Sequence, residues 1–288
     1  MPRTRFEYFA PHTLKEAIEI LQKYENACVM AGGTDLLLRL RKGEVKSEAV
    51  VGLKNINGLG HIAYTKNKGL TIGATALLVD VANNKTIKKH YSGIAAAARK
   101  TANVQIRNMG TVIGNLCNAS PSADNAPMLL VLDGLLNIIG PDGKRKLPLK
   151  DFFKGPGITS LSKGEIVESI DVPPPQPKTG TSYLSLSARG QVDCTAVGVA
   201  VKLTMDGNSC KDAGVAVGAC APTPLRVPEA EECLRGNCLS ETLIDQVAKI
   251  TVEKTSPIND VRASASYRSA TVEVLVKRTI KDAAKNVK

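Results

Sequence analysis

The chain has 288 residues, enough to bury a sizeable core and to form two domains. Its apolar fraction of 43% is ordinary, but aromatic residues make up only 3% and Trp is absent, so aliphatic side chains must build the core. The net charge of +11 comes from basic residues interleaved with acidic ones. No basic helix, aromatic platform or zinc-finger spacing accompanies this charge, which argues against nucleic-acid binding.

Cysteine and histidine usage argues against a metal centre in this chain. The seven cysteines form no Cys-x-x-Cys pair, which predicts reduced thiols. None of the three histidines has a second histidine or a cysteine at ligand spacing, so no zinc or iron-sulphur site is expected. The N-terminus lacks the apolar core of a secretion signal, and no run approaches the ~20 apolar residues of a transmembrane segment. We therefore expect a cytoplasmic protein.

Apolar periodicity predicts a small α/β unit at the start of the chain. Thr13 and Glu16 have the spacing of a capping box and should begin a helix. A short helix should also follow the Gly32-Gly33 turn. The strands predicted in this unit cover residues 6–9, 27–31, 50–53 and 70–73.

The middle of the chain should alternate helices with buried strands. Helices are predicted at 79–83 and 94–101, and a loop containing Pro121 and Pro127 leads to the buried run 128–132. Strands are predicted at 135–139 and 165–172, the first closed by a turn at 141–143.

The proline-rich stretch 173–177 marks the clearest boundary in the chain. Beyond it, three runs separated by turn-length gaps indicate an antiparallel meander, with strands at 182–187, 195–203 and 214–220. Helices are predicted to follow at 229–234, 241–251 and 270–284. The second domain should therefore be β first and then α.

Two glycine-rich loops are the strongest candidates for a binding site. The first, Gly32-Gly33-Thr34-Asp35, directly follows a buried strand, and the second, residues 107–124, joins glycines to small hydroxyl and amide side chains. Glycine permits close approach of the backbone, and such loops can hold a cofactor diphosphate through backbone amides. The P-loop and Rossmann signatures are both absent, so the site is of another kind. The two loops could form one binding device.

Several residues near these loops allow two interpretations each. Asp124 could contact a cofactor or cap a helix or turn. Arg107 could neutralise phosphate or pair with a carboxylate. Cys117 is better explained as a packed small residue than as a redox centre. Arg189 and Asp193 could form a structural ion pair.

Five motifs occur in a characteristic order along nearly the whole chain: Val29-Met-Ala-Gly-Gly-Thr-Asp-Leu36, Thr71-Ile-Gly-Ala74, Gln105-Ile-Arg-Asn-Met-Gly-Thr-Val-Ile-Gly-Asn115, Ala119-Ser-Pro-Ser-Ala-Asp124 and Val261-Arg-Ala-Ser-Ala-Ser-Tyr-Arg268. Together they resemble the FAD-binding medium subunits of molybdenum hydroxylases. That family includes the flavin subunits of carbon monoxide dehydrogenase, xanthine dehydrogenase and nicotinate dehydrogenase.

The resemblance implies an α+β fold. Residues 1–175 would form an FAD-binding domain of the vanillyl-alcohol-oxidase (PCMH) type, in two α/β subdomains covering about 1–55 and 56–175. Residues 178–288 would form a small C-terminal domain with a three-stranded antiparallel sheet and a helical cluster.

The resemblance also implies a set of cofactor-binding residues. The first loop would line the adenosine and diphosphate, the second would line the other side of the diphosphate, and Asp124 would lie near the ribose. This chain has Ile113 where many relatives have Gly, and Ser185 where many have Lys. The implied contacts are Val29, Met30, Ala31, Gly32, Gly33, Thr34, Asp35, Leu36, Thr101, Gly110, Thr111, Val112, Ile113, Gly114, Asn115, Asp124 and Ile166.

The implied function is that of an FAD-carrying electron-transfer subunit in an oxidoreductase complex. FAD would be bound non-covalently, would take electrons from the 2Fe-2S clusters of a small partner subunit and would pass them to an external acceptor, without a catalytic side chain from this chain. A large partner would carry the molybdenum-pterin cofactor, in a dimer of heterotrimers. Two alternatives remain: a stand-alone FAD-dependent reductase or oxidase of related fold, and a basic assembly or RNA-binding protein that binds no FAD.

Overall fold

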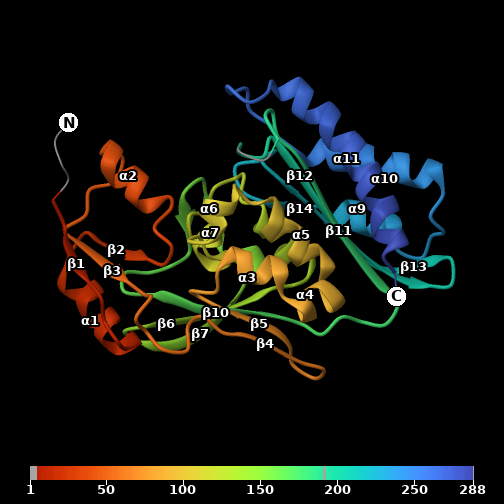
Figure 1. The fold of residues 1–288 in the computed structure, drawn as a ribbon. Coiled ribbons are helices and arrows are strands. Elements are labelled where there is room, and N and C mark those ends of the chain that lie inside the picture. The colour runs from red at the N-terminus through yellow and green to blue at the C-terminus, as the bar shows by residue number, and fades with distance from the viewer. Residues whose placement is uncertain (1–4, 191–192, 288) are drawn as a thin grey trace.

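A computed structural model describes residues 5–190 and 193–287 of the chain (Figure 1). In this part of the chain the strands form a three-stranded, a five-stranded and a four-stranded sheet, together with a two-stranded ribbon. The sheets follow one another along the chain, except that β5 and β10, far apart in sequence, are neighbours in the five-stranded sheet. No helix within the described ranges is long and apolar enough to cross a bilayer.

The first sheet is small and entirely parallel, in the order β1-β3-β2. Its strands and helices are β1 (Glu7–Phe9), α1 (Leu14–Lys23), β2 (Ala27–Met30), α2 (Leu36–Lys42) and β3 (Ala49–Gly52). Thr13 caps α1 as predicted, by accepting a hydrogen bond from the Glu16 backbone N–H. The capping box is incomplete, because the Glu16 carboxylate accepts from the backbone N–H of His12 and not from that of Thr13.

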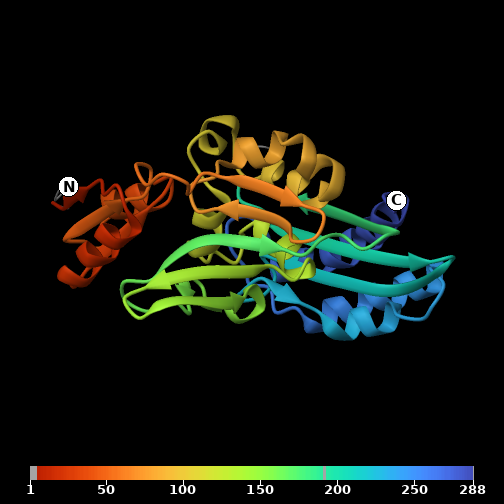
Figure 2. The ribbon, with the colours of Figure 1, turned by 90° about the horizontal axis from the view of Figure 1, so that it is seen from below.

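The second sheet is antiparallel, in the order β4-β5-β10-β6-β7, and Figure 2 shows its strands lying side by side. They are β4 (Ile62–Thr65), β5 (Gly69–Gly73), β10 (Ile166–Val172), β6 (Leu135–Gly140) and β7 (Gly143–Pro148). One face carries the helices α3 (Leu78–Asn83), α4 (Lys85–His90), α5 (Ser92–Lys100), α6 (Val104–Arg107), α7 (Val112–Cys117) and α8 (Asn125–Val131), as Figure 1 shows. A short 3-10 helix (Leu149–Asp151) and the ribbon β8 (Phe153–Gly155) with β9 (Ile158–Thr159) follow β7.

The structure adds elements that apolar periodicity did not reveal. The strands β4, β7, β8 and β9 and the helix α4 were not predicted. The loop predicted at residues 107–124 contains the short helix α7, and the buried run that follows it belongs to the helix α8. Pro127 is the third residue of α8, where its missing N–H breaks no helical hydrogen bond. All seven residues of α8 are buried.

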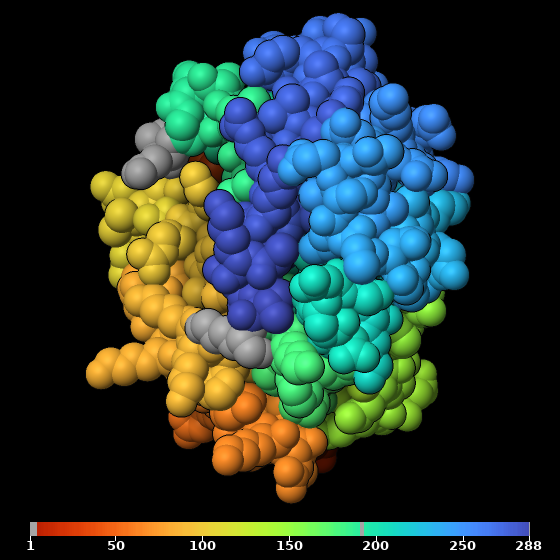
Figure 3. Space-filling model, turned by 90° about the vertical axis from the view of Figure 1, so that its right-hand side faces the viewer, coloured from red at the N-terminus to blue at the C-terminus, as the bar shows by residue number. Residues whose placement is uncertain are grey.

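The third sheet forms the middle layer of the C-terminal half. Its order is β11-β12-β13-β14, with β11 (Thr179–Leu186), β12 (Val197–Asp206), β13 (Ser209–Gly218) and the two-residue β14 (Leu225–Arg226), which adds a fourth strand to the predicted three. Ala200 and Ala216 pack into the core of the N-terminal half, whereas Val199 and Val215 pack into a second core. The helices α9 (Pro228–Leu234), α10 (Glu241–Lys254) and α11 (Ala265–Lys285) cover that second face, and Figure 3 shows α10 and α11 side by side.

Candidate functional site

The two glycine-rich loops touch each other through their backbones. A Cβ atom placed on Gly32 would lie 2.2 Å from the Met109 carbonyl oxygen and 2.8 Å from the Gly110 Cα. These distances are too short for any side chain, so only glycine at position 32 allows the contact. The loop after β2 and the loop before α7 thus form one continuous backbone surface.

Four successive backbone N–H groups of the first loop lack a protein acceptor. No residue in the described ranges accepts a hydrogen bond from the N–H of Gly32, Gly33, Thr34 or Asp35. Gly33 has φ +73°, a left-handed conformation that glycine adopts without strain. Successive free N–H groups in a turn form a concave site for an anion such as a phosphate. We call these four residues and their contact with Gly110 the cradle.

The second loop is held in place by the helices behind it. The backbone N–H of Leu78 donates to the Gly110 carbonyl at 2.9 Å, and Thr111 caps α7 by accepting from the Gly114 N–H at 2.9 Å. A Cβ on Gly110 would lie 3.6 Å from the Thr34 hydroxyl oxygen, which places Thr34 beside the junction. The second side of the cradle is therefore fixed before any ligand binds.

Large apolar side chains close in sequence to the two loops are exposed. They flank the two loops in sequence, at Val29, Leu37, Leu38, Val104 and Met109, and each is more than a third exposed. Exposed apolar surface beside free hydrogen-bond donors suits a ligand that joins a planar ring to a charged group.

Three of the implied contact residues turn their side chains into the core. Val112, Ile113 and Ile166 are each at most 4% exposed and belong to the core cluster of the first half. Only their backbone could meet a cofactor. The departure from Gly at position 113 is thus accommodated inside the protein, where the side chain does not narrow the cradle.

Asp124 is buried and bound to the C-terminal half. Its Oδ1 accepts hydrogen bonds from the Tyr183 hydroxyl at 2.7 Å and the Thr195 hydroxyl at 2.6 Å. Burial raises the pKa of Asp124, although both hydrogen bonds oppose that rise. Burial and the Asp124 charge likewise raise the pKa of Tyr183 well above its usual value. Asp124 occupies the N-cap position of α8 but its side chain does not cap the helix, so the capping interpretation was wrong.

The remaining side chains near the loops have structural roles. Arg107 donates to the backbone carbonyls of Thr101 and Ala102, and to no carboxylate in the described part of the chain. Burial raises the pKa of the Cys117 thiol to about 12, which agrees with a packed residue and not a redox centre. All seven cysteines are free, and the predicted pair between Arg189 and Asp193 is present at 3.3 Å.

Sequence reasoning identified the last motif but not the role of Arg268. This side chain is 2% exposed and donates to the carbonyls of Ala196 and Ala219 and to the Asp260 carboxylate. Burial would raise the pKa of Asp260, but the Arg262 backbone N–H and the Arg268 guanidinium lower it to about 2. Tyr183, Thr195 and Asn125 were also missed, since a lone hydroxyl or amide in an apolar run carries no periodic signal.

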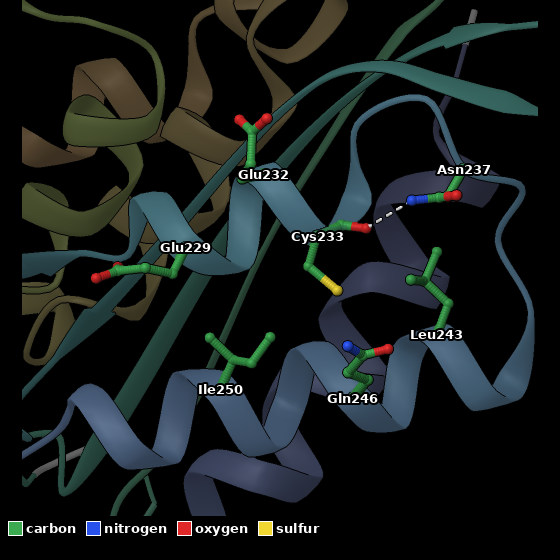
Figure 4. Close-up of a pocket in the computed structure, with 7 residues that line it drawn as sticks. All are labelled: Glu229, Glu232, Cys233, Asn237, Leu243, Gln246 and Ile250. Carbon is green, nitrogen blue, oxygen red and sulfur yellow. Dashed lines mark hydrogen bonds between the residues drawn. The ribbon is translucent and has the colours of Figure 1, made fainter.

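A surface hollow lies away from the cradle, on the C-terminal half. It occupies about 570 Å³ between α9 and α10, and its lining includes Glu229, Glu232, Cys233, Gln246 and Ile250 (Figure 4). Among the described residues no group of three or more His, Cys, Asp or Glu side chains could hold a metal ion.

The free N–H groups of the cradle are typical of proteins that bind a diphosphate-containing cofactor. Comparison with known families specifies the cofactor. The family "FAD binding domain in molybdopterin dehydrogenase" matches residues 4–175, and the family "CO dehydrogenase flavoprotein C-terminal domain" matches residues 182–283. The chain belongs to this family of FAD-binding subunits of molybdenum hydroxylases, which are oxidoreductases.

Similar proteins cover almost the entire chain. The "Xanthine dehydrogenase FAD-binding subunit" of Escherichia coli O157:H7 is 30% identical, over 96% of this chain and 95% of that protein. The "Nicotine 6-hydroxylase medium subunit" of Paenarthrobacter nicotinovorans is 31% identical, over 96% of each. A chain of carbon monoxide dehydrogenase from Hydrogenophaga pseudoflava matches the structure with a TM-score of 0.96 and 28% identity, over 100% of both chains. These matches confirm the resemblance and the two-part α+β fold.

Proposed function

We propose that this chain binds one FAD non-covalently in the cradle and relays electrons from the iron-sulphur clusters of a partner subunit to an external acceptor. The observation that carries the proposal is the backbone contact of Gly32 with Met109 and Gly110, beside four free N–H groups. Free N–H groups that converge on a turn match the charge of a diphosphate. FAD, when bound, supplies the redox chemistry, and the protein supplies binding, orientation and electrostatics.

The residues of the chain would divide this work by position. The backbone of residues 32–35 and of Gly110 would hold the diphosphate, and the exposed apolar side chains beside it would cover the planar ring systems. Asp124 uses Oδ1 for its two protein hydrogen bonds, while Oδ2 has no hydrogen-bond partner in the described ranges and is free to accept from a cofactor hydroxyl.

We further propose that the chain works in a complex with a large molybdopterin subunit and a small iron-sulphur subunit, in a dimer of heterotrimers in the cytoplasm. Support comes from relatives that are named medium chains or medium subunits, including the carbon monoxide dehydrogenase medium chain of Hydrogenophaga pseudoflava. The proposed domains are 1–175, with subdomains of about 1–55 and 56–175, and 178–288. The ranges of the two matching families and the two separate cores support these boundaries.

The test of cofactor binding uses the purified full-length chain. We expect a yellow protein that releases one equivalent of FAD on denaturation, identified by chromatography against FAD and FMN standards. A colourless protein that takes up no added FAD would refute the proposal, as would FMN in place of FAD.

The test of partnership uses native extract and the isolated chain in parallel. We expect the chain to copurify with an iron-sulphur and a molybdenum protein, and alone to pass electrons only between its flavin and artificial dyes or NADH. Efficient turnover of an organic substrate by the chain alone would establish the stand-alone reductase or oxidase instead.

A further inference from the structure

Asn125, the first residue of α8, links two segments behind the cradle. Its side chain is 1% exposed, and its Nδ2 donates to the Thr101 hydroxyl oxygen at 3.1 Å and to the Asn115 Oδ1 at 2.9 Å. The backbone N–H of Asn125 also points to Asn115 Oδ1, at 3.4 Å. The side chain therefore bridges the C-terminal end of α5 and the helix α7.

The groups of Ala97, Thr101, Asn125 and Asn115 form a continuous series of hydrogen bonds. The Ala97 carbonyl fixes the direction of each of these bonds. A carbonyl oxygen can only accept, so the Thr101 hydroxyl must donate its hydrogen to the Ala97 carbonyl, at 3.0 Å. Thr101 can then only accept from Asn125, which must turn its NH2 group toward it. That NH2 group, together with the Asn125 backbone N–H, requires an acceptor at Asn115, so Asn115 turns its Oδ1 inward.

The NH2 group of Asn115 is consequently directed away from Asn125. It has no acceptor in the described ranges, and Asn115 is half-buried. Asn115 stands one helical turn after Thr111, which directly follows Gly110 at the junction of the cradle. The NH2 group is thus a free donor about one helical turn from the contact between Gly110 and Gly32.

This arrangement leaves one buried acceptor without a partner. Asn125 Oδ1 accepts no hydrogen bond, which is unfavourable for a fully buried carbonyl oxygen. A leucine of similar size would leave no such atom. The unpaired oxygen is explained if the amide serves to orient Asn115.

We infer that Asn125 is a positioning residue for cofactor binding, which fixes the Asn115 amide so that its NH2 group donates to an oxygen of the cofactor. The inference rests on the proposed function of the cradle. Without the Asn125 side chain, only the 3.4 Å hydrogen bond from the backbone N–H of residue 125 still holds Asn115 Oδ1 inward, so the amide turns its Oδ1 outward more readily, where it repels a phosphate oxygen of the cofactor.

The test is a double-mutant cycle in the full-length chain, read as the Kd for FAD from quenching of flavin fluorescence. The variants are Asn125→Leu, Asn115→Ala and the double substitution. We expect each single variant to weaken FAD binding about tenfold, which corresponds to about 1.4 kcal/mol. The double variant should bind no more weakly than Asn115→Ala, because Asn125 acts through Asn115.

A matched control is Asn137→Ala. The Asn137 amide also donates two hydrogen bonds, to Ser169 and Asp171, but it lies on β6 of the five-stranded sheet and not beside α7. It should leave the Kd for FAD unchanged. If Asn125→Leu does not fold, Thr101→Val replaces it, because removing the hydroxyl frees the Asn125 amide to rotate and should weaken FAD binding only when Asn115 is present.

The outcomes separate the inference from the proposed function. Wild-type FAD binding with an unchanged Kd in Asn125→Leu would overturn the inference and leave the cradle intact. An equal loss with and without Asn115 would show that Asn125 supports the fold and does not orient Asn115, which also overturns it. No binding by wild type would overturn the proposed function itself, and the inference with it.

Discussion

Replacing Gly32 by Ala should separate the two loops and reduce FAD affinity more than it reduces stability. The added Cβ would lie 2.2 Å from the Met109 carbonyl oxygen and 2.8 Å from the Gly110 Cα, and both obstacles are backbone atoms. Because van der Waals contacts of carbon are relaxed only at about 3.5 Å, the loops must move apart by about 1 Å. Such overpacking costs about 1 to 3 kcal/mol of folding free energy.

The same displacement would act directly on the proposed hydrogen bonds to the diphosphate. A hydrogen bond to a charged group contributes about 1.5 to 3 kcal/mol, so misaligning one of them should weaken FAD binding about 10- to 100-fold. Titration of flavin-free protein with FAD measures the loss, and thermal denaturation without FAD measures the cost in stability. Gly155→Ala is the matched control, since its Cβ would meet only the Ile158 side chain, at 3.7 Å or more. A Gly32→Ala protein with wild-type affinity would refute the assignment of the diphosphate to this junction.

Three further outcomes are expected. Because burial raises the pKa of Asp124 above 3.8, its protonation stabilises the native state at low pH, and that stability is lost as the pH rises. Asp124→Asn keeps an acceptor oxygen and carries no group that titrates, so it does not lose stability in this way. The Tm of the variant minus the Tm of wild type should therefore increase between about pH 4 and pH 7, and a Tm difference that stays constant would contradict the raised pKa of Asp124. Arg268→Met should cost about 3 kcal/mol and lower Tm by roughly 6 to 12 °C, since it removes the guanidinium hydrogen bonds to two buried carbonyls and one of the partners of Asp260, which keeps its contacts with Arg262; an unchanged Tm would show that these bonds are dispensable. Iodoacetamide at pH 8 should modify the exposed Cys194 before Cys117, whose thiol has a pKa of about 12, and mass spectrometry of peptides identifies the order.

The strands that the sequence did not reveal include both edges of the five-stranded sheet. β4 and β7 each pair on one side only, so their side chains need not be apolar. In β7 the lysines at 144 and 146 form ion pairs with carboxylates of β10 on the solvent face. The sequence of such a strand resembles that of a charged loop. The inner strands β5, β6 and β10 were predicted because they lie between two other strands and contain many apolar residues.

The sequence indicated the two loops of the candidate site but not the contact between them. Glycine content and small polar side chains indicated both loops, because their local composition departs from that of ordinary strands and helices. The contact between Gly32 and Gly110 joins residues far apart in the chain, and its geometry depends on the packing of two sheets. The hydrogen bond from Thr195 to Asp124 spans 71 residues, and a threonine just before a strand gives no local sign of such a partner.

The role of the last sequence motif follows from the contacts of Arg268. Its guanidinium holds the carbonyls of Ala196 and Ala219. The residue before Ala196 is Thr195, which binds the aspartate at the end of the second loop, and the N–H of Ala219 donates to the Pro121 carbonyl in the same loop at 2.7 Å. The buried Arg268 side chain thus holds the backbone at Ala196 and Ala219, next to the two hydrogen bonds that hold this loop. The loop cannot shift without breaking hydrogen bonds to residues that flank β12 and β13, so the C-terminal half holds this loop of the proposed cofactor site in place.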